Sequence, residues 1–378
     1  MSKPKILITG GLGFIGLRLG RRLLDAGCHV VAIDNLSPQI HGALPVVDLT
    51  GLVGRDFQVI RGDAGQPEGF AEALGSADAL VHLAAETGTA QSMYELARYN
   101  AVNSQGTAAL LQWLQDHPHR VRKVVLASSR SVYGEGAYRC GACGPVAPDA
   151  RTADRLDSHQ WDPVCPACGS ELELIPTPET SRPRPSSIYA ATKLAQEDLV
   201  RIACGAFGIP FSILRFQNVY GPGQSLHNPY TGILSIFSTR IRRGLDLPIF
   251  EDGKESRDFI HVEDIAEAIR LCLESEATDG QTMNVGTGIP TSVWDMANQL
   301  VRAFGGASKT HLTAQYRLGD IRHCFADISL ISRLTGFTPR VSLEEGLAGF
   351  ARWVDSQPLP EDGLDRANRT LLDKGLMK

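Results

Sequence analysis

Short apolar runs alternate with amphipathic stretches through the first half of the chain. The runs lie at 5–9, 29–33, 57–60, 79–83, 123–127 and 212–216, and their length and composition are typical of buried β-strands. After the first run, Ile15, Leu19 and Leu23 recur at helical spacing and predict a helix with one apolar face. Strands that alternate with helices predict an α/β fold, a Rossmann-like doubly wound parallel sheet whose ligands lie at the carboxyl ends of the strands.

The pattern changes twice along the chain. After Asn218 it loosens into Gly221-Pro222-Gly223 and short mixed elements, which predict a smaller α/β substrate-binding lobe. The interval 135–182 lacks periodicity and is rich in Pro, Gly and Asp. We therefore expect a nucleotide-binding domain at 1–134 and 183–219, an insert at 135–182 and a substrate-binding domain at 220–378.

A glycine-rich turn follows the first predicted strand. Gly10, Gly13 and Gly16 are spaced as Gly-x-x-Gly-x-x-Gly, which we interpret as a departure from the simpler Gly-x-Gly-x-x-Gly motif. In such a turn the backbone closely approaches a pyrophosphate at the helix N-terminus. Asp34 ends the second predicted strand, 18 residues after Gly16, where a carboxylate binds the adenosine ribose and disfavours a 2′-phosphate. Together they predict an NAD site.

Tyr189 and Lys193 stand four residues apart, so on a helix both side chains share one face. A phenol ionises with a pKa near ~10, and a neighbouring cation favours the phenolate, so the pair is a candidate acid/base at neutral pH. Ser129 would be the third hydrogen-bonding group at the reacting centre. The alternative is a packed ring beside a solvated amine.

The insert holds Cys140, Cys143, Cys165 and Cys168, which form two Cys-x-x-Cys-Gly knuckles separated by 21 residues and resemble a zinc ribbon. A long aperiodic loop in a compact domain needs a cross-link to stabilise it, and a structural zinc held by four thiolates supplies one. Two disulfides or four free thiols are the alternatives. Because the insert lies between Ser129 and Tyr189, we expect it to brace a lid near the mouth of the active site.

Composition limits the function. The chain has 378 residues, 43% apolar and 21% charged, which is enough for two lobes around a substantial core. A net charge of −5 offers no electrostatic footprint for nucleic acid. No apolar stretch approaches the ~20 residues of a membrane span, so we expect a cytoplasmic protein without a membrane partner. Four further cysteines fit a reducing compartment as packing residues: Cys28, Cys204, Cys272 and Cys324.

Further motifs occur in order along the chain. They are Gly62-Asp63, Leu83-Ala84-Ala85, Asn103-Ser104-Gln105-Gly106-Thr107, Arg215-Phe216-Gln217-Asn218, Ser256-Arg257-Asp258-Phe259-Ile260-His261-Val262, Asn284-Val285-Gly286-Thr287-Gly288 and Arg317-Leu318-Gly319-Asp320. With the glycine turn and the Tyr/Lys/Ser set, these motifs resemble the extended short-chain dehydrogenase/reductase family, specifically its NAD-dependent nucleotide-sugar epimerases and dehydratases. The resemblance extends from Ile6 to about Phe350.

The resemblance implies the members of the site. The catalytic residues are Ser129, Tyr189 and Lys193. The NAD-binding residues are Gly10, Gly13, Phe14, Ile15, Gly16, Asp34, Asn35, Asp63, Ala64, Leu83, Ala84, Ala85, Asn103, Tyr189, Lys193 and Phe216. The ligands of a nucleotide-diphosphate sugar are Ser129, Arg130, Asn218, Arg257, Arg317 and Tyr230, with His227 and Asn228 beside them. In this family two helices, here expected at 96–115 and 189–204, form a dimeric bundle, so a homodimer is expected.

The residues beside Ser129 select among the reactions of the family. The 4,6-dehydratases carry Asp-Glu directly after the Ser/Thr, and uronate decarboxylases typically carry a Glu, whereas this chain has Arg130 and Ser131. The resemblance then implies 4-epimerisation, in which C4 of a hexose is transiently oxidised and hydride returns to the opposite face. The run at 218–232 and the cysteine-rich insert resemble dTDP-L-rhamnose 4-epimerases, which interconvert that sugar and dTDP-6-deoxy-L-talose.

Other functions stay open at this point. Another UDP- or GDP-hexose 4-epimerase would use the same residues, and a nucleotide-sugar 4-ketoreductase would consume NAD(P)H and release its product. A docking module on a degenerate dehydrogenase scaffold would need a damaged catalytic set and a basic insert. Neither is found, since the set is intact and the insert mixes Asp149, Asp154, Asp157 and Glu171 with its arginines.

Overall fold

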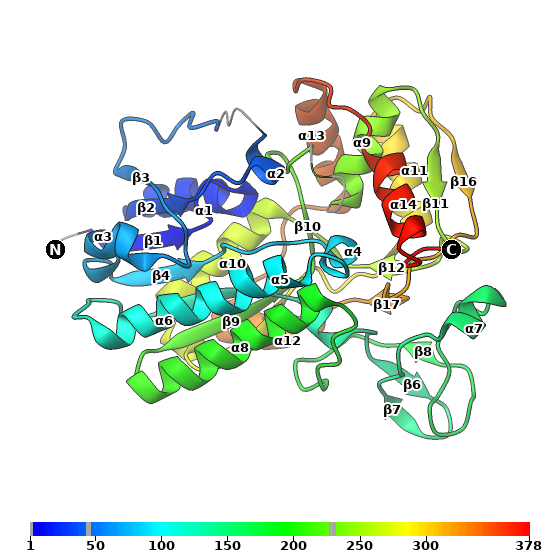
Figure 1. Ribbon diagram of the computed structural model, residues 1–378, viewed down its shortest axis with the longest axis horizontal. Helices are drawn as coiled ribbons and strands as arrows, with labels where there is room; N and C mark the ends of the chain where they lie inside the picture. The colour runs from blue at the N-terminus through cyan, green and yellow to red at the C-terminus, as the bar shows by residue number, and fades with distance from the viewer. Residues whose placement is uncertain (1–2, 43–46, 227, 229–231) are drawn as a thin grey trace.

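A seven-stranded parallel sheet forms the centre of the molecule (Figure 1), in a computed structural model that describes residues 3–42, 47–226, 228 and 232–378. The strand order is β14-β9-β5-β4-β1-β2-β3, and every neighbouring pair is parallel. The strands are β1 (Lys5–Thr9), β2 (His29–Asp34), β3 (Phe57–Arg61), β4 (Ala79–His82), β5 (Val124–Ser129), β9 (Phe211–Phe216) and β14 (Gln281–Val285). The predicted doubly wound sheet is confirmed.

Helices cover both faces of this sheet because its strands are apolar on both sides. In β1, Ile6 and Ile8 pack into one hydrophobic cluster and Leu7 into another. The first face is covered by α1 (Phe14–Asp25), α10 (Val262–Glu274) and α12 (Ser329–Thr335). The second is covered by η1 (Pro67–Phe70), α3 (Ala71–Gly75), α6 (Gly106–Asp116) and α8 (Ile188–Phe207).

The helix expected at 96–115 is a composite. It consists of α5 (Leu96–Tyr99), a π-helical segment η2 (Asn100–Gln105) and α6, in direct succession. π-Helical segments occur frequently at functional sites. Here the segment carries Asn103, whose buried amide contacts Thr192 on α8 and the backbone of Glu86.

The chain returns to the main sheet after Asn218, so the domain boundary differs from the expected one. Strand β14 pairs with β9, and α10 packs along α1. Assigning all of 220–378 to the second lobe was therefore wrong for these elements. The polar residues Gln281, Thr282 and Asn284 concealed β14, which as an edge strand needs no continuous apolar run.

The second lobe has its own hydrophobic core. Its elements are β10 (Asn218–Tyr220), α9 (Ile233–Arg242), β11 (Leu247–Ile249), β12 (Ser256–Arg257), β13 (Phe259–His261), β15 (Thr291–Ser292), α11 (Val293–Ala303), β16 (Thr310–Leu312), β17 (His323–Cys324), α13 (Leu343–Asp355) and α14 (Leu364–Asp373). The short helix η4 (Glu276–Thr278) instead packs against α10 and α12 beside the main sheet. Short helices α2 (Pro38–His41) and α4 (Thr89–Ser92) follow β2 and β4 in the chain. The core is formed by α9, α11, α13 and the strands between them.

The cysteine-rich insert is a small separate lobe (Figure 1). It consists of β6 (Tyr138–Cys140), β7 (Gly144–Val146), α7 (Ala153–Asp157) and β8 (Glu173–Leu174), with β6 in the middle of an antiparallel sheet. The short helix η3 (Arg130–Tyr133) precedes the insert and packs against α8. Leu156 and Trp161 pack against Tyr316 and Leu318 of the second lobe. Among all described helices, none combines the length and the apolar character needed to cross a membrane.

Candidate active site

A cavity of about 580 Å³ runs along the carboxyl ends of the sheet strands and continues between the lobes. Its wall begins at the glycine turn after β1 and ends at α14. This is the position at which doubly wound sheets bind ligands, because the loops there diverge and leave room between them.

The glycine turn brings three backbone segments close together. Gly10 has a φ of +68°, and a Cβ there would lie 2.9 Å from the Ala84 nitrogen. A Cβ on Gly16 would lie 2.4 Å from the Gly10 oxygen. Gly11 is packed as tightly, since a Cβ there would meet Ala32 at 2.6 Å. Gly11, Gly13 and Gly16 also match Gly-x-Gly-x-x-Gly, so the interpretation that this motif is missing was wrong.

The Asp34 carboxylate closes the nucleotide end of the cavity. It is buried at the end of β2, where it accepts hydrogen bonds from the backbone of Leu12 (3.1 Å) and Leu36 (2.9 Å). Asn35 donates to Asp63 at 3.0 Å and completes this rim. His41, which the sequence did not single out, lies 3.4 Å from Asp34.

Most expected cofactor residues line the same wall. The lining residues among them are Gly10, Gly13, Phe14, Ile15, Gly16, Asp34, Asn35, Asp63, Ala64, Leu83, Ala84, Ala85, Tyr189, Lys193 and Phe216. Asn103 differs, because it is fully buried behind the wall and does not line the cavity. Its amide hydrogen-bonds Thr192 (3.0 Å) and the backbone of Glu86, so it supports two cavity elements from behind.

Ser129, Tyr189 and Lys193 meet in the middle of the cavity wall. Ser129 ends β5, and the other two lie one turn apart on α8, whose first turn is capped by Ser187. Lys193 Nζ donates 2.9 Å to the Ala127 carbonyl oxygen, while the Ser129 hydroxyl lies close enough to Tyr189 to act on the pKa of the phenol. The phenol, the hydroxyl and the amine therefore line the same part of the cavity.

Burial dominates the ionisation of this set. It raises the pKa of Tyr189, whereas the hydrogen-bonding effect of Ser129 and the charge of Arg130 lower it by a smaller amount. Burial also lowers the pKa of Lys193 to about 7, despite the opposing charge of Glu197. The expected lowering of the phenol pKa by Lys193 is therefore not found, and Ser129 and Arg130 have that effect instead.

Three arginines face the other half of the cavity. Arg130 donates to Asn218 Oδ1 at 2.9 Å, and burial lowers its pKa to about 10. Arg257 is held by backbone carbonyls, and Arg317 lies over the Phe250 ring with its buried Nε unpartnered. None of the ion pairs within the described residues involves any of the three. Buried cations without counterions favour an anionic ligand.

Several lining residues escaped the sequence analysis. They are Phe250, Glu251, Glu255 and, on α14, Leu364, Ala367, Asn368 and Leu371. Asp320, which the sequence analysis named in a motif without giving it a role, also lines the cavity. The helical spacing of Leu364, Ala367 and Leu371 predicts a buried helix face but not its place beside the cavity. Of the residues expected near the sugar, Asn228 is buried, whereas His227 and Tyr230 lie outside the described residues.

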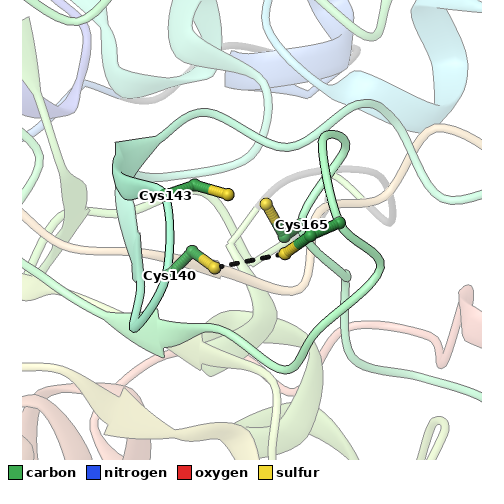
Figure 2. Close-up of side chains that lie close together, drawn as sticks. Cys140, Cys143 and Cys165 are labelled. Atoms are coloured by element: carbon green, nitrogen blue, oxygen red, sulfur yellow. Dashed lines mark hydrogen bonds between the residues drawn. The ribbon is translucent and has the colours of Figure 1, made fainter.

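The four insert cysteines lie together. Their sulfur atoms are all within 4.8 Å of one another, and Cys140 and Cys168 are separated by 3.5 Å. Figure 2 shows the labelled Cys140, Cys143 and Cys165 with their sulfur atoms turned toward a common centre. Zn–S bonds of about 2.3 Å in a tetrahedron place sulfur atoms ~3.8 Å apart, so the donor set fits zinc. All eight cysteines are free thiols, so neither alternative disulfide is present.

Comparisons with known proteins agree with this geometry. The sequence matches the profile of the "NAD dependent epimerase/dehydratase family" over residues 6–151 and 165–286, and the unmatched 152–164 belong to the insert. A dTDP-L-rhamnose 4-epimerase of Burkholderia thailandensis is 39% identical over 369 residues, which are 96% of this chain and 97% of that protein. A UDP-glucose 4-epimerase of Mycolicibacterium smegmatis is 30% identical over 91% of this chain and 96% of that protein.

Solved structures show the same fold. The UDP-glucose 4-epimerase of Thermotoga maritima with UDP-glucose has a TM-score of 0.74 and 28% identity, covering 93% of this chain and 98% of that one. The UDP-glucuronic acid 4-epimerase of Bacillus cereus with UDP-glucuronic acid and NAD has a TM-score of 0.73 and 27% identity, covering 93% and 99%.

Proposed function

Because this chain belongs to the NAD dependent epimerase/dehydratase family and is an NAD-dependent nucleotide-sugar 4-epimerase, we propose that it interconverts dTDP-L-rhamnose and dTDP-6-deoxy-L-talose. The identity of 39% over almost the whole of both chains to a dTDP-L-rhamnose 4-epimerase is the observation that supports this sugar. Arg130 and Ser131 after Ser129 agree with it, because neither suits the elimination of water.

The cofactor end of the cavity suits a dinucleotide. Its glycine turn leaves no room for Cβ atoms, and the N-terminus of α1 faces the cavity through Gly13 and Phe14. Asp34 would accept the adenosine ribose hydroxyls, and Lys193 would lie by the nicotinamide ribose. NAD, when bound, supplies a hydride acceptor and donor at its nicotinamide ring.

The proton transfers would be made by Tyr189. Its oxygen takes the proton from the C4 hydroxyl as the carbonyl forms and returns it after the sugar has turned over. Ser129 would donate a hydrogen bond to the same C4 oxygen, and the charge of Arg130, which opposes the effect of burial on the pKa of Tyr189, would favour the phenolate. Because the keto sugar presents its other face on return, C4 is inverted without net redox change.

The unpaired arginines would bind the diphosphate. Arg257 and Arg317 are fixed from behind by backbone carbonyls and an aromatic ring, so their N–H groups are oriented before ligand arrives. Arg130, held by Asn218, is close enough to both Arg257 and Tyr189 to interact with them electrostatically, and it would reach the sugar or the adjoining phosphate.

The test is a panel of dTDP-, UDP- and GDP-hexoses incubated with purified protein without added cofactor. Proton NMR should show inversion at C4 for dTDP-L-rhamnose and no inversion for GDP-sugars. Inversion of a UDP-hexose alone would refute the proposed sugar, and reduction dependent on added NAD(P)H would indicate a 4-ketoreductase instead. Release of NAD on heat denaturation would show that the dinucleotide copurifies.

We also propose that the four-cysteine cluster holds one structural zinc. All four ligands are protein thiolates, and no position is left for a catalytic water. Metal analysis of purified protein should give one zinc per chain. Cys143→Ser should abolish stoichiometric zinc binding, whereas Cys28→Ser, which changes a thiol outside the cluster, should retain it. Full zinc content in both variants would refute the site.

A homodimer through α5–α6 and α8 is the remaining proposal. These helices pack against each other and expose Leu96 and Ile202. Light scattering should give twice the chain mass, and Ile202→Glu should weaken the dimer; a monomer at micromolar concentration would refute it.

A further inference from the structure

The side chain of Arg322 joins the insert to the second lobe. It is fully buried, and its Nε donates 2.8 Å to Asp162 of the insert. Its terminal nitrogens contact Asp252 at 2.6 and 2.9 Å and Glu251 at 3.0 Å. The guanidinium is thus fixed between the insert and the turn that carries two of the acids.

The main chain at the same place holds the diphosphate arginine. Arg257 Nη1 donates 2.9 Å to the Arg322 carbonyl oxygen, and Nη2 donates 2.8 Å to that of Ile321. The Arg322 N–H is bound in turn by the Glu135 carboxylate at 2.8 and 2.9 Å. Any shift of the insert that moves residues 321–322 therefore redirects Arg257.

Both cysteine knuckles lie close to these contacts in the chain. Asp162 precedes Cys165 by three residues, and Tyr138, whose hydroxyl donates to Glu135 at 3.3 Å, precedes Cys140 by two. Joining the two knuckles through one metal ion therefore fixes Asp162 relative to Glu135. Apart from a metal, the two knuckles are connected by the short strands of the insert and by Arg151, which donates 3.1 Å to the Trp161 carbonyl oxygen and pairs with Glu135 at 3.4 Å.

We propose that Asp162 and Arg322 are positioning residues through which metal occupancy of the cysteine cluster sets the orientation of Arg257 and hence the affinity for the nucleotide diphosphate. The inference rests on the proposed function, because it assigns the diphosphate to Arg257. It also changes the expected role of the insert, which holds the floor of the substrate site through residues 321–322 instead of covering the sugar as a lid.

The test compares zinc-loaded and chelated protein by calorimetric titration with dTDP and, separately, UDP. In the wild type, removing zinc should weaken binding of the preferred nucleotide about tenfold and leave NAD content unchanged. With zinc bound, Asp162→Ala should weaken binding three- to tenfold and raise KM with little effect on kcat, and Asp162→Glu should recover part of the loss. In Asp162→Ala, chelation should weaken nucleotide binding by no more than a further factor of about two, because the variant already lacks the contact between Asp162 and Arg322.

Asp154→Ala is the matched control, since it removes an exposed insert carboxylate that makes none of these contacts. Equal chelation effects in Asp162→Ala and the wild type, or unchanged affinity in zinc-loaded Asp162→Ala, would overturn the inference. If circular dichroism shows that the chelated protein unfolds, the affinities of the zinc-loaded variants alone test the inference. Failure of the wild type to bind either nucleotide would refute the proposed function instead, so the two failures are distinguishable.

Discussion

Lys193 on α8 donates a hydrogen bond of 2.9 Å to the carbonyl oxygen of Ala127 on β5. The contact joins the helix that carries Tyr189 to the strand that ends in Ser129. The hydrogen bond thus fixes the relative position of the phenol and the hydroxyl, and it holds an amine whose pKa burial lowers to about 7 in the same site. This relationship leads to separate predictions for the tyrosine and the lysine.

Replacing Tyr189 by Phe should lower kcat by about 10²–10⁴-fold, because the group that moves the C4 proton is lost while the ring still fills its place. Bound NAD and the circular dichroism spectrum should be unchanged. Tyr99→Phe is a suitable control, since that ring lies edge-on to Tyr189 but its hydroxyl donates to Thr87. A near-normal rate in Tyr189→Phe would show that another group moves the proton.

Lys193 should make stability depend on pH in a defined direction. Its pKa is about 7 in the folded protein because of burial, and an unfolded lysine titrates near ~10.4. Between these values the unfolded chain binds the additional proton. The free energy of unfolding should therefore rise with pH, relative to Lys193→Met, by up to about 1.4 kcal/mol per pH unit.

Urea unfolding of the apo-protein at pH 7, 8 and 9 measures this difference. Lys309→Met, which removes an exposed lysine, serves as the control and should follow the wild type. Parallel pH curves for the wild type and Lys193→Met would contradict the shifted pKa.

Much of the fold could be predicted from the sequence because its signals are local. The central strands are mostly apolar runs, and the glycine turn and the Tyr/Lys spacing each predict their own local structure. Strand β14 was not assigned to the sheet, since an edge strand with Gln281, Thr282 and Asn284 lacks such a run. The role of Asn103 depends on tertiary contacts with Thr192 and Glu86 that no spacing reveals.

The electrostatics of the site could not be predicted in the same way. The chain order shows that Lys193 is near Tyr189, but the pKa of each is governed by burial, which depends on the complete fold. Arg322 is likewise inconspicuous in the sequence. Its importance arises from acids that lie far away in the chain, at positions 162 and 251–252.

Gly16→Ala should destabilise the protein by roughly 2–4 kcal/mol and reduce bound NAD, because the new Cβ would lie 2.4 Å from the Gly10 oxygen and backbone cannot yield as a flexible side chain does. Gly205→Ala on α8 is the matched control, since a Cβ there meets nothing within 4 Å. That change should be neutral or stabilise by up to about 1 kcal/mol. Thermal unfolding of both variants measures the difference. An equal loss of stability in Gly16→Ala and Gly205→Ala would contradict the packing argument.

Arg317→Met should separate stability from binding. In the free protein the guanidinium is buried without a carboxylate partner, and burial lowers its pKa, so removing the charge should leave the free energy of unfolding unchanged or raise it. In the complex the same group would bind the diphosphate, so affinity for dTDP or UDP should fall by about 10- to 150-fold, equivalent to about 1.5–3 kcal/mol.

Titration calorimetry and urea unfolding of the same preparation measure both effects. Arg139→Met, an exposed arginine on the insert strand β6, is the control and should change neither quantity. A purely structural arginine would give the opposite pattern, with a large loss of stability and affinity unchanged once the protein is folded. That outcome would remove Arg317 from the nucleotide site and leave Arg130 and Arg257 as the candidates for binding the diphosphate.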